Sequence, residues 1–402
     1  MRLLLTLLWT ALLAVPTQAQ SSGSGKKNRL IIGFKIGTDA PAREAILKRF
    51  GLDAVEARDL GALNLVVVEA AAGKVAPSAF RLMSDPAVFH VEEDFYTNWL
   101  AGVGSLHEVP FPTLRSVMAD LPKLQSKDAT EGEMPWGIAR VKAQSAWERT
   151  QGDGVKVAVV DTGIDFKHPD LAANYAGGTN VVDSKKSPMD DNGHGTHVAG
   201  TIAAVKDGQG VVGVAPKAKL YAVKVLDGDG GGNLSGIVKG ILWCADNGIQ
   251  VANMSLGAAR GSIFMRMALV YAKYKGVVVV AAAGNSGGDV SYPGAYEETL
   301  AVSASDSSDK IAEFSSRGKQ VDFIAPGVGV KSSIPGGGYD RYSGTSMATP
   351  HVAGLAALAV SQGASGLAGV KAMLGAAAKP LAGLKPEEQG AGMIDAGLIR
   401  KR

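Results

Sequence analysis

The sequence predicts an α/β fold for most of the chain, with a mainly parallel β-sheet flanked by helices on both faces and a small α+β domain before it. Two observations predict this class. After residue 135, near-continuous apolar runs alternate with helical segments, which indicates strands buried on both faces of a parallel sheet. Before residue 100, a shorter alternation of strands and helices indicates a separate, smaller unit.

Length and composition allow two folded units and say little about the class of function. The 402 residues exceed one typical domain, and a hydrophobic share of 46% supplies a real core. The 41 Lys and Arg nearly balance the 38 Asp and Glu, so nothing predicts a nucleic-acid partner. Cys244 is the only cysteine, which excludes an intrachain disulfide, and its apolar neighbours predict a buried, inert thiol.

Residues 1–19 have the layout of a signal peptide. Arg2 is followed by an apolar run, residues 3–15, and by small residues at positions 17 and 19. A membrane anchor is the alternative, but this run is shorter than the roughly 20 residues that a spanning helix needs. We therefore expect secretion, to the extracellular space or the periplasm, and no membrane attachment once the signal is removed. Residues 20–28 are rich in Ser, Gly and Lys and predict a linker.

Residues 29–100 predict the small α+β unit, of the split β-α-β kind. Strands are expected at residues 30–36, 63–69 and 88–95, and helices at 42–50 and 77–83. A unit of about 70 residues has a thin core and is marginal alone. Residues 101–134 follow, where three prolines interrupt any period, and they predict a linker or an N-terminal arm.

The larger unit, residues 135–402, is expected to place its strands at residues 155–160, 220–226, 249–254, 277–283 and 300–303. Ligands of such sheets bind at the carboxyl ends of the strands. Asp161 directly follows the first of these strands, and Asn285 follows the fourth. These two residues are therefore the first candidates for a functional site.

Ser346 lies at the start of an apolar helix expected over residues 352–360. Its hydroxyl can be read as a simple helix cap or as a nucleophile beside unpaired backbone N–H groups. Asp161 likewise has a structural alternative, an Asx-turn or a cap. The Asp161-Thr162-Gly163 triplet does not indicate an aspartic protease, because those enzymes need two such carboxylates. His194 and His197 could be metal ligands three residues apart, although no third ligand is evident near them.

Taken together, Asp161, His194 and Ser346 satisfy the chemical needs of acyl transfer. Ser346 supplies a hydroxyl nucleophile, His194 an imidazole base, and Asp161 a carboxylate that fixes the tautomer of the imidazole. Asn285 adds a side-chain amide donor suited to an oxyanion, and the N–H of Ser346 is a second donor.

Four motifs carry a family resemblance: VAVVDTGID around Asp161, GHGTHVAG around His194, AAAGN at Asn285 and SGTSMATPHVAG around Ser346. In this order they closely resemble the motifs of the subtilisin-like serine proteases, from about residue 135 to residue 396. The resemblance implies an endopeptidase with these three residues as its triad and Asn285 in the oxyanion hole. An α/β-hydrolase would instead need G-x-S-x-G around its serine.

By the same resemblance, two extended segments clasp the substrate backbone, and the residue pair before Asn285 contributes to the pocket beside them. The implied substrate-binding residues are Gly230, Gly231, Gly232, Ser255, Leu256, Gly257, Ala282 and Gly284. The glycine segment has two alternatives, a flexible loop and a calcium turn at residues 227–230. The loop at residues 285–293 is shorter than in familiar subtilisins, and we expect medium or large apolar side chains in the primary pocket.

The first unit resembles the propeptide of the same family, a ferredoxin-like inhibitor domain, including Val91-Glu92-Glu93-Asp94 near its end. The resemblance implies that this domain helps the protease to fold and then plugs its active site. It places the autoprocessing bond at Leu100-Ala101, with Leu100 in an apolar pocket. The arm at residues 101–134 departs from the family pattern, and a second cut within it is plausible.

A structural calcium ion is implied by the resemblance alone. Asp170 and Asp207 match side-chain ligands, and the carbonyls of Val205, Gln209 and Val211 complete an oxygen cage. A further family ligand, a glutamine, aligns with Gly132, so Glu131 or Glu133 would have to replace it. Two solvated aspartates are the alternative interpretation.

These expectations combine into a secreted, self-processing serine endopeptidase that acts on proteins or peptides as a monomer, without an organic cofactor. Two other classes remain in view. A catalytically idle peptide-binding or inhibitory protein would keep the fold but not the chemistry. A dinucleotide-binding oxidoreductase fits the alternating strands but lacks G-x-G-x-x-G after the first strand.

Overall fold

A computed structural model describes residues 28–56, 60, 63–70, 75–101 and 134–401. The expected signal peptide, most of the linker after it and nearly all of the arm therefore lie outside the described residues. In the larger unit, a nine-stranded sheet has the order β16-β17-β13-β12-β11-β10-β6-β8-β7 among the residues described. Its neighbours pair in parallel except β16 and β17. The strands are β6 (Lys156–Asp161), β7 (Tyr175–Asn180), β8 (Lys219–Lys224), β10 (Val251–Met254), β11 (Val278–Ala282), β12 (Thr299–Ser305), β13 (Val321–Pro326), β16 (Ala378–Lys379) and β17 (Met393–Ile394).

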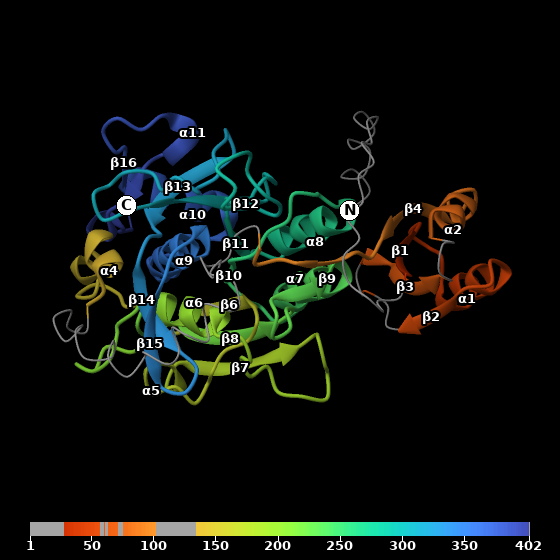
Figure 1. The fold of residues 1–402 in the computed structure, drawn as a ribbon, viewed down its shortest axis with the longest axis horizontal. Coiled ribbons are helices and arrows are strands. Elements are labelled where there is room, and N and C mark those ends of the chain that lie inside the picture. Colours follow the sequence, from red (N-terminus) through yellow and green to blue (C-terminus); the bar gives the residue numbers. More distant parts are fainter. Residues whose placement is uncertain (1–27, 57–59, 61–62, 71–74, 102–133, 402) are drawn as a thin grey trace, which may run out of the picture.

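Helices cover both faces of this sheet, which confirms the predicted fold class (Figure 1). Along β6, Val157 and Val159 pack into the core on the side of α6 (His194–Ala203) and α9 (Thr345–Ser361). Ala158 and Val160 pack into the core on the side of α7 (Leu234–Asp246) and α8 (Ile263–Tyr274). This alternation is why the strand reads as a continuous apolar run. The helices of this unit are α4 (Trp136–Arg140), α5 (Pro169–Ala172), α6 (His194–Ala203), α7 (Leu234–Asp246), α8 (Ile263–Tyr274), α9 (Thr345–Ser361), α10 (Gly366–Ala377) and α11 (Pro386–Gln389), with 3₁₀ turns η3 (Ala143–Ser145) and η4 (Ala396–Leu398).

Several strands of the larger unit were not predicted, because their sequences contain no continuous apolar run. Strand β7 has the sequence YAGGTN, and the edge position explains why it needs no continuous apolar side chains. Strands β14 (Val330–Ile334) and β15 (Gly338–Tyr342) form a two-stranded antiparallel hairpin outside the main sheet. Among the described residues, no single helix is long and apolar enough to cross a membrane, and α9 with α10 meets that test only as a pair bent by 104°.

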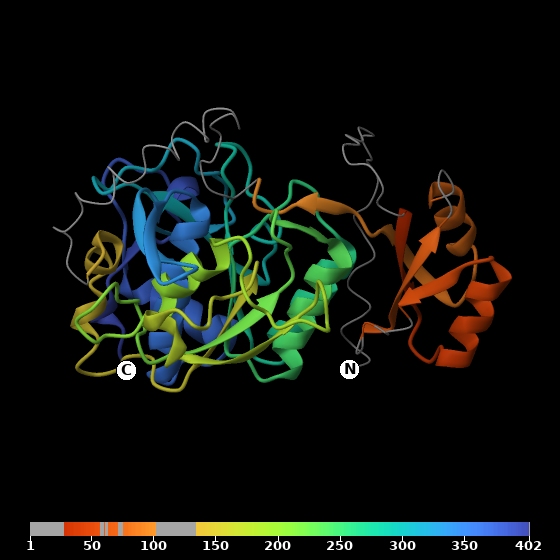
Figure 2. The same ribbon diagram turned by 60° about the horizontal axis from the view of Figure 1, so that its bottom comes forward.

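The smaller unit is a four-stranded antiparallel sheet with two helices on one face (Figure 2). The sheet order is β2-β3-β1-β4, from β1 (Asn28–Phe34), β2 (Asp53–Glu56), β3 (Leu65–Ala70) and β4 (Val88–Glu93). Leu30, Ile32 and Phe34 face the helices α1 (Ala40–Arg49) and α2 (Val75–Leu82). Ile31 points the other way and joins the buried cluster of α7 and α8, so the bare face of this sheet packs against the larger unit.

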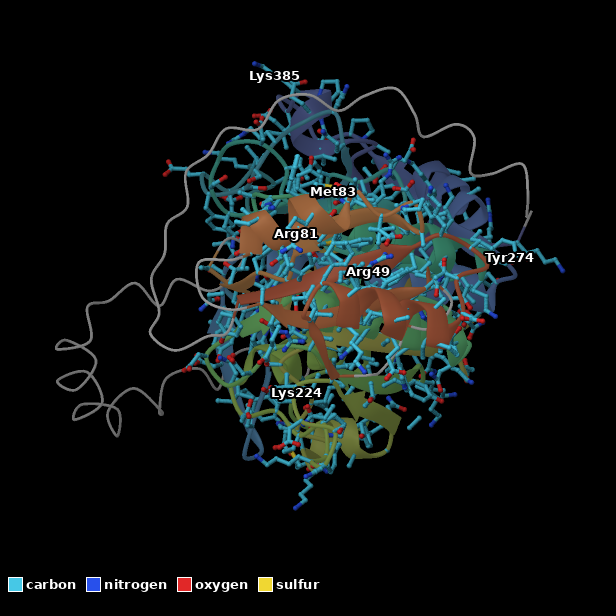
Figure 3. All side chains as sticks on the ribbon, turned by 90° about the vertical axis from the view of Figure 1, so that its right-hand side faces the viewer. Arg49, Arg81, Met83, Lys224, Tyr274 and Lys385 are labelled. Carbon is cyan, nitrogen blue, oxygen red and sulfur yellow. The ribbon has the colours of Figure 1, made fainter. Side chains whose placement is uncertain are left out.

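The outer side of the smaller unit is formed by α1 and α2. Arg49, Arg81 and Met83 reach the surface there (Figure 3). The inner side meets the larger unit, and an edge-to-face contact between Phe89 and Phe264, with ring centroids 6.0 Å apart, lies within that contact. Gly33 makes the approach possible, since a Cβ atom there would lie 2.5 Å from the ring of Phe89.

The strand expected at residues 88–95 ends earlier than predicted. Strand β4 stops at Glu93, and the chain crosses to the larger unit as β5 (Tyr96–Asn98), which pairs antiparallel with β9 (Gly231–Asn233). The cause is Asp94, whose carboxylate is bonded to Ser235 at the start of α7 instead of continuing the sheet. The prediction of one strand over this stretch was wrong, because hydrophobic periodicity cannot reveal a partner strand so distant in sequence.

Candidate active site

Asp161 and His194 meet in a buried hydrogen bond at the end of β6. The Nδ1 atom of His194 lies 2.8 Å from Oδ1 of Asp161, and the two side chains are 3% and 0% exposed. The same Oδ1 accepts from the N–H of Thr162 at 2.7 Å. A carboxylate at Nδ1 favours the tautomer with its proton there, so that Nε2 faces outward as a base.

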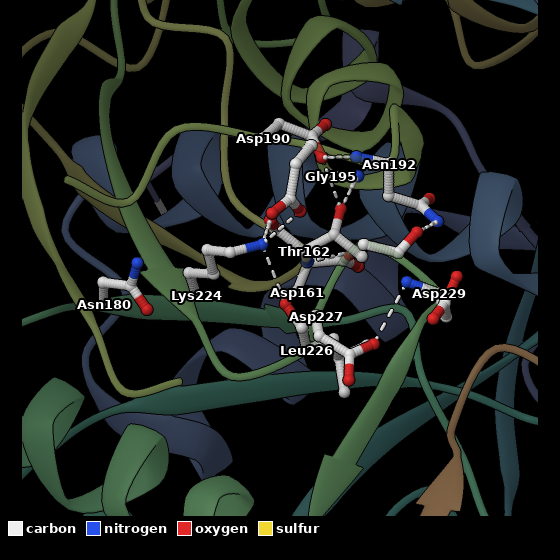
Figure 4. Close-up of polar contacts among 12 residues, drawn as sticks. Asp161, Thr162, Asn180, Asp190, Asn192, Gly195, Lys224, Leu226, Asp227 and Asp229 are labelled. Atoms are coloured by element: carbon white, nitrogen blue, oxygen red, sulfur yellow. Dashed lines mark hydrogen bonds and ion pairs between the residues drawn. The ribbon is translucent and has the colours of Figure 1, made fainter. Parts of the chain in front are cut away.

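A second carboxylate, Asp190, joins the loop after β6 to the start of α6 (Figure 4). Its Oδ1 accepts from the hydroxyl of Thr162 at 2.8 Å and from the N–H groups of Asn192 and Gly193 at 3.0 Å. Its Oδ2 accepts from both the N–H and the hydroxyl of Thr196. These bonds satisfy donors that a helix start leaves unpaired, and they position His194 relative to Asp161.

Lys224 adds a buried cation to this cluster. Only 4% of its side chain is exposed, and its Nζ donates to the carbonyl of Thr162 at 2.5 Å, to that of Leu226 at 2.9 Å and to Asp191 at 2.6 Å. The lysine thus links the loops on which Asp161 and His194 lie. Asp190 and Lys224 were not predicted from the sequence. For Asp190, the available signal was an acidic residue a few positions before a glycine-rich helix start.

Ser346 is the second residue of α9, and it does not cap the helix. Gly344 holds the N-cap position, and no side chain there makes a cap hydrogen bond. The Ser346 hydroxyl donates to the carbonyl of Ser255 at 3.1 Å, and the Ser255 hydroxyl donates to the carbonyl of Ser346 at 2.7 Å. The Nε2 atom of His194 is buried and has no hydrogen-bond partner within the described residues. The side-chain cap, one of the two interpretations of Ser346, is therefore excluded.

Asn285 lies beside Ser346, although it comes from the end of β11. Its Oδ1 accepts from the N–H of Thr345 at 2.9 Å and from the Thr345 hydroxyl at 2.8 Å. The N–H of Gly284 donates to the same hydroxyl at 3.1 Å. Because both bonds engage the oxygen of the amide, its nitrogen is held on the side away from Thr345. This orientation suits a donor to an oxyanion.

Two of the predicted substrate segments enclose the end of the smaller unit. The N–H of Trp99 donates to the carbonyl of Gly230 at 3.0 Å, and the N–H of Gly257 donates to the carbonyl of Trp99 at 2.9 Å. The indole N–H of Trp99 donates to Gly232 at 2.9 Å. Residues 96–99 therefore lie as an extra strand between the two segments, the geometry by which a cleft binds an extended peptide.

An apolar pocket in the cleft holds Trp99. Trp99 is 0% exposed and belongs to the same buried cluster as Leu226, Leu234 and Leu256. Leu100 is only half-buried, against Gly230, and Ala101 is exposed. Leu100 packs only partly against the same cluster, so the structure does not enclose its side chain as the resemblance implied, because a matched chain position does not set the direction of a side chain.

Ala282 and Gly284, also predicted at the site, are buried at the end of β11. Ser291 lies against Gly284, since a Cβ atom added to that glycine would lie 2.5 Å from the Ser291 hydroxyl. Ser291 is therefore a further candidate for the pocket wall. This wall could not be predicted from the sequence, because the loop at residues 285–293 is shorter than in familiar subtilisins.

Two carboxylates of the smaller unit cap helices of the larger one. Glu92 accepts from the hydroxyl of Ser262 at 2.6 Å and from the N–H of Ile263 at 2.7 Å, at the start of α8. Asp94 accepts from the N–H and the hydroxyl of Ser235 at 2.7 and 2.8 Å, at the start of α7. Burial raises the pKa of Asp94, against the lowering effect of its bonds to Ser235. Both contacts place negative charge at helix N-termini, where it is stabilised.

The predicted calcium ligands lie together. Asp170 is buried and accepts from the N–H of Val211 at 2.9 Å and from the hydroxyl of Tyr339 at 3.0 Å. Burial raises the pKa of Asp170, and the charge of Asp207 adds to the rise. Oxygen donors with two neighbouring carboxylates fit a hard cation. Within the described residues no group of three His, Cys, Asp or Glu side chains is placed for a metal, and Glu131 and Glu133 lie outside them.

The alternative metal site at His194 and His197 has no support. The Nε2 atom of His197 lies 2.9 Å from the carbonyl of Val330, and its ring stacks on Tyr342 with centroids 4.3 Å apart. Burial, assisted by His194, lowers the pKa of His197 to about 3. His197 is thus a neutral packing residue. Cys244 is buried as expected, and burial raises the pKa of its thiol.

Comparison with known proteins gives consistent matches. Residues 152–392 match the model of the subtilase family. The chain is 53% identical to subtilisin Savinase of Lederbergia lenta over 227 residues, 56% of this chain and 83% of that protein. It is 40% identical to subtilisin E of Bacillus subtilis (strain 168) over 370 residues, 89% of this chain and 87% of that protein. M-protease of Shouchella clausii (strain KSM-K16) is 53% identical over 227 residues, 56% of this chain and 59% of that protein.

Proposed function

The chain belongs to the subtilase family of serine endopeptidases, and on that premise we propose that it is a secreted, self-processing protease whose triad is Asp161, His194 and Ser346. The observation that carries the proposal is the buried bond between His194 and Asp161, together with the bond of Ser346 to Ser255, in the same segment whose Gly257 binds the strand in the cleft. Its substrates are proteins or peptides that add a strand between residues 230–232 and 255–257.

The reaction begins when the Ser346 hydroxyl turns from the carbonyl of Ser255 toward Nε2 of His194. The Oγ atom attacks the peptide carbonyl while Nε2 takes its proton, and Asp161 stabilises the resulting imidazolium. The Nδ2 group of Asn285 and the N–H of Ser346 donate to the oxyanion. His194 then gives the proton to the departing amine. Water, deprotonated by the same nitrogen, hydrolyses the acyl-enzyme and restores Ser346.

The same proposal makes residues 29–100 an inhibitory propeptide that is cut at Leu100-Ala101. It is supported by β5, by the main-chain bonds of Trp99 in the cleft and by the helix caps from Glu92 and Asp94. A segment held this way occupies the place of a substrate until it is removed. A second cut within residues 101–134 would set the mature N-terminus.

Calcium is proposed as a structural ion and no organic cofactor is invoked. Asp170 and Asp207 would hold it with the carbonyls of Val205, Gln209 and Val211. The bound ion would neutralise the two carboxylates and fix the loop at residues 205–211. Residues 1–19 would direct secretion, and the mature enzyme would act as a monomer.

Labelling with a fluorophosphonate tests this function. The processed protein should react at Ser346 and lose its activity on casein in proportion to labelling. Heat-unfolded protein is the control, because an isolated serine hydroxyl is not activated. If the folded, processed protein neither reacts nor cleaves casein, the fold serves peptide binding without catalysis.

A further inference from the structure

The two carboxylate oxygens of Asp227 have different partners. One accepts hydrogen bonds within the loop before β9, and the other accepts a hydrogen bond from the smaller unit. Its Oδ1 accepts from the N–H groups of Asp229 and Gly231 at 3.1 and 2.9 Å, a turn held by its own side chain. These bonds account for the motif at residues 227–230 without a calcium ion. The Oδ2 atom accepts from the hydroxyl of Tyr96 at 2.5 Å.

The loop leaves room for a large side chain at this point. Gly231 faces the phenol ring of Tyr96, and a Cβ atom added to that glycine would overlap the ring. A cavity of about 110 Å³ lies beside the pair, lined in part by Tyr96, Asp227 and Gly231. The neighbouring Asn98 donates to the carbonyl of Asp229 at 2.8 Å and fixes the register of the strand. Tyr96, two residues earlier on the same face of this strand, is thereby aimed at Asp227 by the pairing of β5 with β9.

The charges at this position favour a hydrogen-bond donor. Burial raises the pKa of the Tyr96 hydroxyl, and the bond to Asp227 and the charges of Asp227 and Asp229 raise it further. Two cationic residues, Arg29 and Lys239, also line the cavity. Arg29 pairs with Asp94 at 2.9 Å, and it belongs to the smaller unit, which the proposed function removes.

We infer that Asp227 forms a specificity subsite that selects a hydrogen-bond donor, above all lysine or tyrosine, four residues before the residue in the place of Leu100. The inference rests on the proposed function, since it takes residues 96–100 as the image of a bound substrate. A substrate side chain that ends in a cation or a phenol donates a hydrogen bond to the Asp227 carboxylate. A phenyl ring offers no such donor, and a second carboxylate is repelled by the charge of Asp227.

Four fluorogenic peptides test the subsite. They share the sequence Thr-Asn-Trp-Leu before the cleaved bond, as in residues 97–100, and carry Lys, Tyr, Phe or Glu in the place of Tyr96. The enzyme is the full chain after its own processing. We expect kcat/KM for the Lys and Tyr peptides to exceed that for Phe by about fivefold to twentyfold, with Glu the poorest.

Two variants test whether the preference comes from the Asp227 side chain. Asp227→Asn keeps an oxygen that can accept the loop's N–H bonds and replaces Oδ2 by a donor. The ratio of kcat/KM for the Lys peptide to that for the Phe peptide should therefore fall to near one, and kcat/KM for the Glu peptide should rise. Asp229→Asn is the matched control, because it removes the same charge from the same loop while its side chain is exposed and its main-chain carbonyl still accepts from Asn98. It should keep most of the preference.

Equal cleavage of all four peptides by the wild-type enzyme would overturn the inference and leave the proposed function standing. An equal loss of preference in both variants would also overturn it, since the selection would come from the loop's net charge and not from the Asp227 contact. If none of the peptides nor casein is cleaved, the proposed function fails and the subsite fails with it.

Discussion

At the scale of single residues, the geometry of the candidate active site depends on buried polar groups that have no role in the proposed reaction. Asp190 accepts hydrogen bonds from Thr162, after β6, and from Thr196, in the first turn of α6. Lys224 donates to the carbonyl of Thr162. A buried carboxylate or ammonium is costly unless it is paired, and these two are paired throughout. The pairing therefore fixes the relative positions of Asp161 and His194 before any substrate arrives.

The Ser346→Ala variant should lose turnover by a factor on the order of 10⁶, the loss that removal of the same group costs subtilisin. The hydroxyl is the attacking group in the proposed mechanism, and no other group takes its place. Steady-state cleavage of casein and of the Lys peptide measures the loss, after residues 29–100 have been removed from the variant by a second protease that is then inactivated. Thr349→Ser, a change to a hydroxyl of α9 that bonds only to the carbonyl of Thr345, is the control and should stay active.

His197 and His351 predict a loss of stability in mild acid. Burial lowers the pKa of His351 to about 4 and contributes most of the lowering of the His197 pKa to about 3, whereas an unfolded chain titrates near about 6.5. Below that pH these two histidines bind protons in the unfolded chain but stay neutral in the folded protein. The free energy of unfolding should fall by about 1.4 kcal/mol per pH unit for each histidine down to the folded pKa.

Denaturant titrations of the Ser346→Ala protein between pH 7 and pH 5 measure this slope. His351→Asn should remove about half of it, because Asn can still donate to the carbonyl of Met347 but does not titrate. An unchanged slope in this variant would show that other groups cause the acid sensitivity.

At the scale of elements, the smaller unit is tied to the starts of α7 and α8. Glu92→Ala and Asp94→Ala in the Ser346→Ala background should each expose unpaired N–H groups and weaken the contact by about 1 kcal/mol. Hydrogen exchange should show about fivefold faster exchange of the amides of Ile263 and Ser235, respectively. Glu93→Ala is the matched control, since its pair with Arg260 spans 3.5 Å between largely exposed side chains. Faster exchange after the Glu93 change, or none after the other two, would contradict this account.

The elements that the sequence predicted are those with long apolar runs. Strands β6, β8 and β11 lie buried between helices, so their composition alone revealed them. Strand β7 at the sheet edge and strand β5 in the cleft were missed or misplaced, because their pairing depends on distant partners. At the site, the family motifs indicated Asp161, His194, Asn285 and Ser346. The directions of Trp99 and Leu100, and the network around Asp190, could not be read from the sequence, because they depend on contacts between segments that are distant in the chain.

At the scale of the whole molecule, the proposed calcium site would link α5 to the loop at residues 205–211. Chelation of calcium from the Ser346→Ala protein should lower its Tm by several degrees, since an ion at about 100 times its Kd contributes about 2.7 kcal/mol. Asp207→Ala should lower the Tm in calcium and make it insensitive to chelator. A Tm that does not respond to chelator in the parent protein would refute the site. Scanning calorimetry measures both.

The smaller unit has a dual relation to the larger one in this account: its bare sheet face needs α7 and α8 for burial, and its end fills the cleft. Both follow from the same short crossover at residues 94–95, which turns the chain from a sheet edge into the substrate position. Under the proposed function, the segment after this crossover carries the Leu100-Ala101 bond, so the cut that frees the cleft would also separate the smaller unit from the larger one.

The most direct test of self-processing is the intact mass and N-terminal sequence of the purified wild-type and Ser346→Ala proteins. The wild type is predicted to separate after Leu100, with or without a second cut before residue 135, and the variant is predicted to keep residues 29–402 in one chain. A purified Ser346→Ala protein that still cuts itself after Leu100 would contradict the central claim.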